Sequence, residues 1–118
     1  MNFETKRIDD ITIFKLNEKR LDTSISGLVK GEFTLLLKVQ NVTKLIVDLS
    51  EVESCDSSGL SALLVANRIV ESMGGSLRIS GPSEKVSTLI KITHLDRVLT
   101  VRENTEIAFE ELKNQKNF

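Results

Sequence analysis

The fold is decided by the run Lys44-Leu45-Ile46-Val47-Asp48-Leu49-Ser50 and by Asp56-Ser57-Ser58-Gly59-Leu60, which follows it closely. The first run is short, apolar and rich in branched side chains, which is typical of a strand covered on both faces. After the serines, apolar residues recur at helical spacing until Gly74-Gly75. The serines therefore occupy the first turn of a helix after a buried strand, where free N–H groups and the helix dipole accommodate negative charge.

Apolar spacing also predicts the strands and the helix that precede Lys44. Strands are expected at residues 3–8 and 11–16, with a tight reversal at Asp9-Asp10 between them. Thr23 or Ser24 is expected to cap a first helix. Its apolar stripe is expected to consist of Ile25, Leu28, Val29, Phe33 and Leu36.

On the C-terminal side, strands are expected at residues 75–79 and 98–101. Ser83 is expected to cap a short helix, and Asn104 a terminal helix. The terminal helix is expected to pack through Ile107, Ala108 and Leu112, and residues 114–118 are expected to fray. The alternation predicts one α/β domain over residues 1–118, with a mixed, mostly parallel sheet, an antiparallel edge hairpin and about four helices.

Composition excludes several classes of function. The net charge of −1 and an aromatic content of 4%, all phenylalanine, argue against nucleic acid as a partner. No apolar run approaches the roughly 20 residues of a membrane span, so no membrane association is expected. A single cysteine suits a reducing compartment, and we expect a cytoplasmic protein. With one histidine and no glycine-rich nucleotide motif, we expect neither a metal nor a cofactor.

The sequence resembles the STAS domain family and, within it, the bacterial anti-sigma-factor antagonists. The resemblance extends over nearly the whole chain. Its strongest elements are the strand at 45–49, the motif at 56–60, Gly74-Gly75, and Leu21-Asp22 after the second strand. It implies that Ser57 is phosphorylated by a partner that is both an anti-sigma factor and a GHKL-type serine kinase. The unmodified protein would capture that kinase, phosphorylation would weaken the capture, and a PP2C-like phosphatase would reverse the modification.

Each residue of the motif also has a simpler structural reading. Ser57 could cap the helix. Asp56 could be the helix cap, or a carboxylate that positions the acceptor hydroxyl. Ser58 is expected to be a residue of the first helical turn and not a second phosphorylation acceptor. Gly59 allows close approach of another backbone segment. Leu60 could belong to the core or anchor a partner.

Asp22 could simply start the first helix, although the resemblance places it beside Ser57. Asp22, Asp56, Ser58, Gly59 and Leu60 are therefore the expected partner-binding residues around the acceptor Ser57. An enzyme is not expected, because GxSxG is absent and nothing marks an oxyanion hole. The main alternative function is a constitutive adaptor, or a small-ligand sensor subunit of a signalling or transport assembly. Such a subunit needs no acceptor serine, so the acceptor serine distinguishes the two functions.

Overall fold

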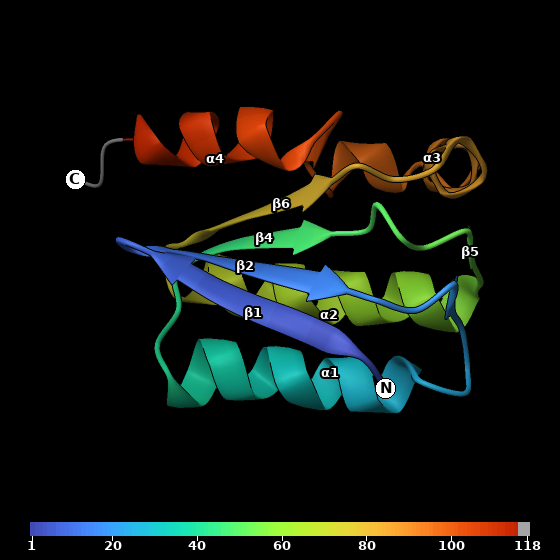
Figure 1. Cartoon of the computed structure of the whole chain (residues 1–118), viewed down its shortest axis with the longest axis horizontal. Helices are drawn as coiled ribbons and strands as arrows, with labels where there is room; N and C mark the ends of the chain where they lie inside the picture. Colours follow the sequence, from blue (N-terminus) through green and yellow to red (C-terminus); the bar gives the residue numbers. More distant parts are fainter. Residues whose placement is uncertain (116–118) are drawn as a thin grey trace.

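A mixed β-sheet forms the centre of the computed structural model, which describes residues 1–115 (Figure 1). Within these residues its strand order is β1-β2-β4-β6-β7. β1 and β2 are antiparallel, and the remaining neighbours are parallel. The predicted α/β fold with an edge hairpin is therefore confirmed. The strands span Phe3–Ile8 (β1), Ile11–Leu16 (β2), Lys44–Asp48 (β4), Ser76–Ser80 (β6) and Val101–Arg102 (β7).

Helices cover both faces of the sheet. In Figure 1, α1 and α2 lie on one face, α4 lies on the other, and α3 lies beyond the ends of the strands. No helix within residues 1–115 combines the length and the apolar character needed to cross a membrane. The helices are α1 (Ser26–Thr34), α2 (Ser57–Ser72), α3 (Glu84–Ile92) and α4 (Thr105–Lys113), with a π-helical turn at Leu35–Val39 and a 3₁₀ turn at Leu95–Arg97.

The predicted caps are confirmed at two helices and wrong at the first. The Ser83 hydroxyl accepts the Val86 N–H at 3.2 Å at the start of α3, and Asn104 caps α4. α1 begins only at Ser26, after an N-cap residue that provides no side-chain hydrogen bond. Instead the Asp22 carbonyl accepts the N–H groups of Ile25 and Ser26, because the chain turns at Asp22 before the helix forms.

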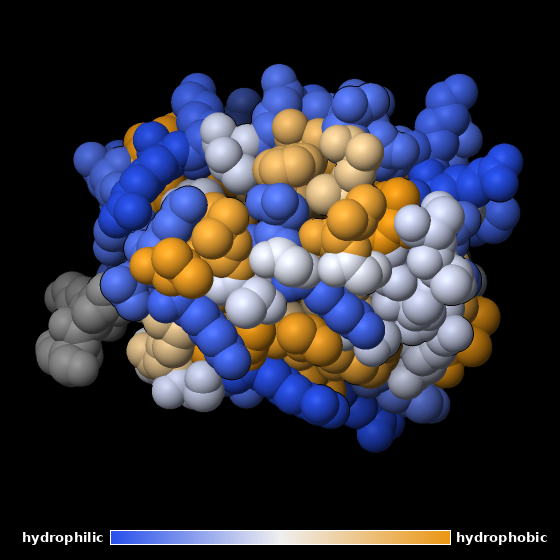
Figure 2. Space-filling view, turned by 90° about the horizontal axis from the view of Figure 1, so that it is seen from below, coloured by the Kyte–Doolittle hydropathy of each residue, from blue (hydrophilic) through white to orange (hydrophobic). Residues whose placement is uncertain are grey.

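Two predicted packing positions are also wrong. Leu28 of α1 is 58% exposed and Ile107 of α4 is 43% exposed, whereas Val29, Phe33 and Leu112 are buried as predicted. Figure 2 views the molecule from the side on which α1 lies and shows apolar side chains interspersed with charged ones. The outward side of α1 therefore adds little to the core.

The last strand was predicted at residues 98–101 but spans Val101–Arg102, so it begins later and is shorter, because the 3₁₀ turn at Leu95–Arg97 precedes it. Of the segment 114–118, which was expected to fray, Asn114 is the C-cap of α4. Residues 116–118 lie outside the described part of the chain. A second, unpredicted pairing joins β3 (Arg20–Leu21) in parallel to β5 (Ser54–Cys55).

Candidate functional site

The corner between β4 and α2 is fixed to the core on both sides. Leu49 and Val52 follow β4 and are each no more than 1% exposed, although Ser50 and Glu51 between them are exposed. The chain then forms β5 and enters α2 through Asp56. The first turn of α2 is therefore held by buried side chains and by the β3–β5 pairing.

Asp56 is the N-cap of α2, which resolves one of the alternatives left open by the sequence. Its Oδ1 accepts the Gly59 N–H at 3.0 Å and the Ser58 hydroxyl at 2.6 Å. These two hydrogen bonds, that of Ser58 foremost, lower the pKa of the Asp56 carboxyl. The carboxylate is thus stabilised in its charged form, which makes it a poor acceptor for a further proton.

Thr23 completes this network, and sequence reasoning missed it. Its hydroxyl donates to Asp56 Oδ2 at 3.3 Å and lies 3.2 Å from the Ser58 hydroxyl. The sequence suggested Thr23 only as a cap for the first helix. Its position beside Asp56 follows from the β3–β5 pairing, which joins segments more than thirty residues apart.

Ser57 is the first residue of α2 and is exposed. Within residues 1–115 its hydroxyl makes no hydrogen bond, in contrast to the hydroxyl of Ser58. The alternative reading of Ser57 as the helix cap is wrong, because Asp56 provides the cap. The structure therefore presents one free and one engaged serine hydroxyl on adjacent residues.

Gly59 and Leu60 are buried beneath the two serines. A Cβ on Gly59 would collide with the Leu21 carbonyl and lie 2.6 Å from Cys55 Sγ, so the close backbone approach predicted here is confirmed. Leu60 is 4% exposed and packs in the core. Both residues support the corner from within.

Asp22 lies beside the corner, and within residues 1–115 no hydrogen bond joins it to Ser57. Its Oδ1 accepts the N–H of Ser24 at 3.0 Å and the Ser24 hydroxyl at 2.5 Å. The preceding carbonyl, that of Leu21, accepts the Asp56 N–H at 3.3 Å. Asp22 therefore shapes the turn before α1 and also adds negative charge near the first turn of α2.

Negative charge gathers around this corner. Burial, together with the neighbouring charges of Asp56 and Asp22, raises the pKa of Cys55 to about 12. The Cys55 thiol is therefore protonated at neutral pH. Glu51 and Glu53 are exposed in the preceding loop. Within residues 1–115, no cluster of His, Cys, Asp or Glu is arranged to hold a metal ion.

Known proteins with this fold include anti-sigma-factor antagonists. Proteins of Thermotoga maritima and Thermotoga neapolitana, each described as a "putative anti-sigma factor antagonist", are 28% identical over 113 residues, covering 96% of this chain and 99% of each relative. The crystal structure of the Thermotoga maritima protein superposes with a TM-score of 0.86 and covers 95% of both chains. The unphosphorylated form of the anti-sigma factor antagonist SpoIIAA, at 19% identity, has a TM-score of 0.77 and covers 97% of this chain and 100% of its own.

The family assignment rests on a match that extends over most of the sequence. Residues 2–108 match the STAS domain, and this range includes the sheet, the first three helices and the corner that carries Ser57. The chain therefore belongs to the STAS domain family.

Proposed function

We propose that this protein is a cytoplasmic anti-sigma-factor antagonist that acts as a phosphorylation-controlled binding switch and not as an enzyme. In its unphosphorylated form it captures an anti-sigma factor that is also a GHKL-type serine kinase. Phosphorylation of Ser57 releases that partner, and a PP2C-like phosphatase restores the binding form. The relatives described as anti-sigma factor antagonists support this role.

The observation that carries the proposal is the free, exposed hydroxyl of Ser57 beside the engaged hydroxyl of Ser58. A phosphate on Ser58 would disrupt the capping network and would lie next to the Asp56 carboxylate. A phosphate on Ser57 breaks no hydrogen bond among the described residues and lies at a helix N-terminus, which favours negative charge. Ser57 is therefore the acceptor that the corner tolerates.

The proton of Ser57 must be taken up by a group outside this network. Both carboxylate oxygens of Asp56 already accept hydrogen bonds, and its pKa is lowered. We therefore assign Asp56 to holding the first turn of α2 in place. The base for phosphoryl transfer is supplied by the kinase.

Release follows from charge and not from refolding. Phosphorylation adds about −1.5 to −2 charges at neutral pH. The added charges lie near the carboxylates of Asp22, Glu51, Glu53 and Asp56. The corner itself is held rigid by the buried residues Gly59 and Leu60. A partner surface that accommodates the neutral serine is then repelled. SpoIIAA has solved structures in unphosphorylated and phosphorylated forms, and both share this fold, with TM-scores of 0.77 and 0.71.

The test is co-expression with GHKL-type serine kinases encoded in the same genome, followed by intact-mass analysis. We expect a gain of one phosphate in the wild type and none in Ser57→Ala. In calorimetry, Ser57→Ala should bind the kinase and Ser57→Asp should bind at least about tenfold more weakly. Thr88→Asp, which adds the same charge at an exposed position of α3, is the matched control and should bind normally.

Equal affinities of Ser57→Ala and Ser57→Asp for a kinase that binds the wild type would refute the switch. The chain would then be better explained as a constitutive adaptor, because capture would not depend on the state of Ser57. Phosphate found on Ser58 in the wild type would instead contradict the assignment of the acceptor.

A further inference from the structure

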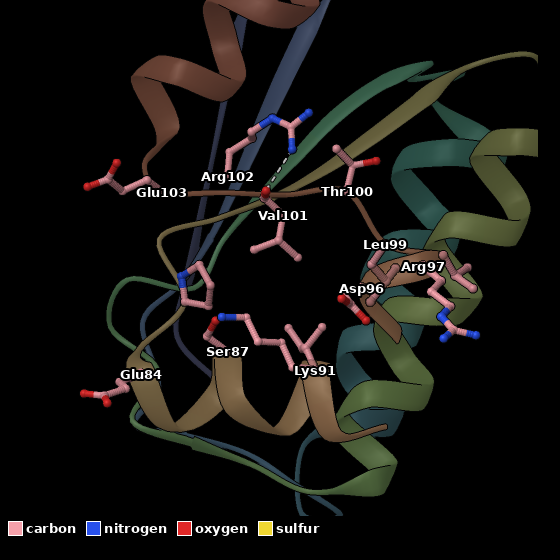
Figure 3. Close-up of a pocket in the computed structure, with 13 residues that line it drawn as sticks. Glu84, Ser87, Lys91, Asp96, Arg97, Leu99, Thr100, Val101, Arg102 and Glu103 are labelled. Atoms are coloured by element: carbon pink, nitrogen blue, oxygen red, sulfur yellow. Dashed lines mark hydrogen bonds between the residues drawn. The ribbon is translucent and has the colours of Figure 1, made fainter. Parts of the chain in front are cut away.

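A cleft lies between α3 and the segment from Asp96 to Glu103 (Figure 3). Its volume is about 730 Å³, which lies within the range of roughly 300–1,000 Å³ that is common for small-molecule sites. Its lining residues begin at Pro82, so they include none of the residues of the Ser57 corner. The cleft is therefore a separate feature of the molecule.

The floor and one wall of the cleft are apolar. Ile90 and Leu99 are each only 1% exposed, so they close the cleft from below. In Figure 3, the Val101 side chain projects from β7 toward α3. These side chains offer an apolar slot to the flat or branched body of a small molecule.

The opposite wall carries a cation and a hydroxyl. Ser87 and Lys91 are four residues apart on α3 and therefore share a helix face. In Figure 3 their side chains reach toward one another across from Val101. Among residues 1–115, Lys91 forms no ion pair. An ammonium group and a hydroxyl group are thus both available to one acidic group.

The other charged residues of the lining limit how much negative charge fits. Arg102 is engaged, because its Nε donates to Glu111 at 2.7 Å and its Nη1 donates to the Val101 carbonyl at 2.9 Å. Glu84 and Glu103 point away from the cleft in Figure 3. Arg97, the remaining lining cation, points away from Ser87 and Lys91 in Figure 3. Asp96 lies on the Arg97 side of the cleft, where it opposes a second negative charge. The lining therefore suits a monoanion better than a polyphosphate.

We propose that this cleft binds a small amphipathic monoanion, such as an aromatic or branched carboxylate or sulfonate. Its apolar body lies between Val101 and Ile90, and its acidic group contacts Lys91 Nζ and the Ser87 hydroxyl. The proposal does not depend on phosphorylation of Ser57.

α3 also connects the cleft to the switch corner. The Ser83 hydroxyl caps α3 and donates to the Glu53 carbonyl at 3.3 Å, three residues before Asp56. A ligand packed against the other side of α3 is therefore placed to influence the loop that leads into Ser57.

The probe for this site is 8-anilinonaphthalene-1-sulfonate, which combines an aromatic body with a single sulfonate. Fluorescence titration should show saturable 1:1 binding, and amide shifts in ¹H–¹⁵N spectra should cluster at α3 and residues 96–103. Lys91→Gln should weaken binding about tenfold through loss of a charge-assisted contact, and Lys91→Arg should retain it. Lys85→Gln, an exposed position on the same helix that does not line the cleft, is the matched control.

A second variant tests the shape of the site independently of its charge. Ser87→Phe leaves Lys91 in place but fills the slot, and it should abolish the shifts at residues 96–103. The neutral analogue N-phenyl-1-naphthylamine should bind more weakly than the sulfonate. The proposal is overturned if Lys91→Gln and Lys85→Gln bind the sulfonate alike. It is equally overturned if the shifts map to exposed Leu28, Leu35 and Val39 on the α1 side, which would show adventitious binding of the additive only.

Discussion

The two faces of the sheet are covered in different ways. On the face of α1 and α2, a large cluster of buried side chains includes Phe14, Phe33 and Leu63. On the face of α4, the buried cluster consists of Ile11, Ile46, Ala108 and Leu112. α4 is held there in addition by Glu111, which pairs with Arg78 and Arg102 of the two strands beneath it.

The difference bears on where the fold tolerates added negative charge. The Ser57 corner sits on the large cluster through Leu60, and hydrophobic burial is insensitive to added surface charge. The α4 face depends partly on the half-buried ion pairs of Glu111, which respond to salt and pH. Negative charge added at the α4 face would therefore disturb that face more than a phosphate on Ser57 would disturb the Ser57 corner.

The largest test compares one leucine from each face. Leu63 and Leu112 are both fully buried. Leu63→Ala should destabilise the fold by about 4 kcal/mol, because the change leaves a cavity within the large cluster of buried side chains. Leu112→Ala should cost about 2 kcal/mol, because α4 alone can settle toward the sheet. Urea unfolding monitored by circular dichroism measures both values. Equal losses would show that the two faces are packed equally well.

The next test concerns the corner itself. Gly59→Ala should destabilise by about 3 kcal/mol, because a Cβ meets the Leu21 backbone and Cys55, neither of which can move freely. Gly31→Ala is the matched control: its Cβ would enter open space in α1, so the change should stabilise by up to about 1 kcal/mol. If Gly59→Ala were tolerated as well as Gly31→Ala, the corner would not be rigid.

Much of the fold could be predicted from the sequence, because the strands and α2 have strong apolar periods. The start of α1 could not, since it depends on backbone hydrogen bonds to the Asp22 carbonyl and not on a capping side chain. Successive helical residues are about 100° apart, so Leu28 lies at the margin of the stripe that Val29 defines and turns outward.

The site was predictable in its motif but not in its supporting contacts. The position of Asp56 and Ser57 at the start of a helix follows from the strand-to-helix pattern, whereas the choice of Ser57 as the acceptor is implied only by the resemblance to the STAS family. Thr23 does not, because its contact with Asp56 depends on a two-residue pairing, β3 with β5, which is too short to show a period. The cleft beside α3 likewise arises from packing of separate segments, and only Ser87 and Lys91 share a recognisable spacing within it.

A smaller effect is expected at alkaline pH from Cys55 in the corner. Its folded pKa is raised to about 12, above the unfolded value of about 8.5. Its contribution to stability is therefore fully present below about pH 8.5 and is lost as the pH rises from there toward 12. Wild type should lose stability more steeply over this range than Cys55→Ala, as measured by unfolding in urea at a series of pH values. Parallel curves would contradict the raised pKa.

The smallest effect is expected at Glu111 on the α4 face. Its hydrogen bond to Arg102, and then that to Arg78, hold the pKa of the Glu111 carboxyl below its usual value. Its contribution is therefore present above the unfolded pKa of about 4.3 and is lost as the pH falls through the lower folded value. Glu111→Gln should cost less than about 1 kcal/mol at neutral pH, because the group is partly exposed.

Salt distinguishes this contribution from packing. The cost of Glu111→Gln should shrink in 1 M sodium chloride, where charges are screened over about 3 Å, whereas the cost of Leu112→Ala should not. Glu110→Gln, at the neighbouring exposed position, should change stability by no more than about 0.5 kcal/mol at either salt concentration. A salt-independent cost for Glu111→Gln would mean that Glu111 packs against the sheet instead of holding α4 by charge. The two faces would then differ only in the extent of their apolar clusters.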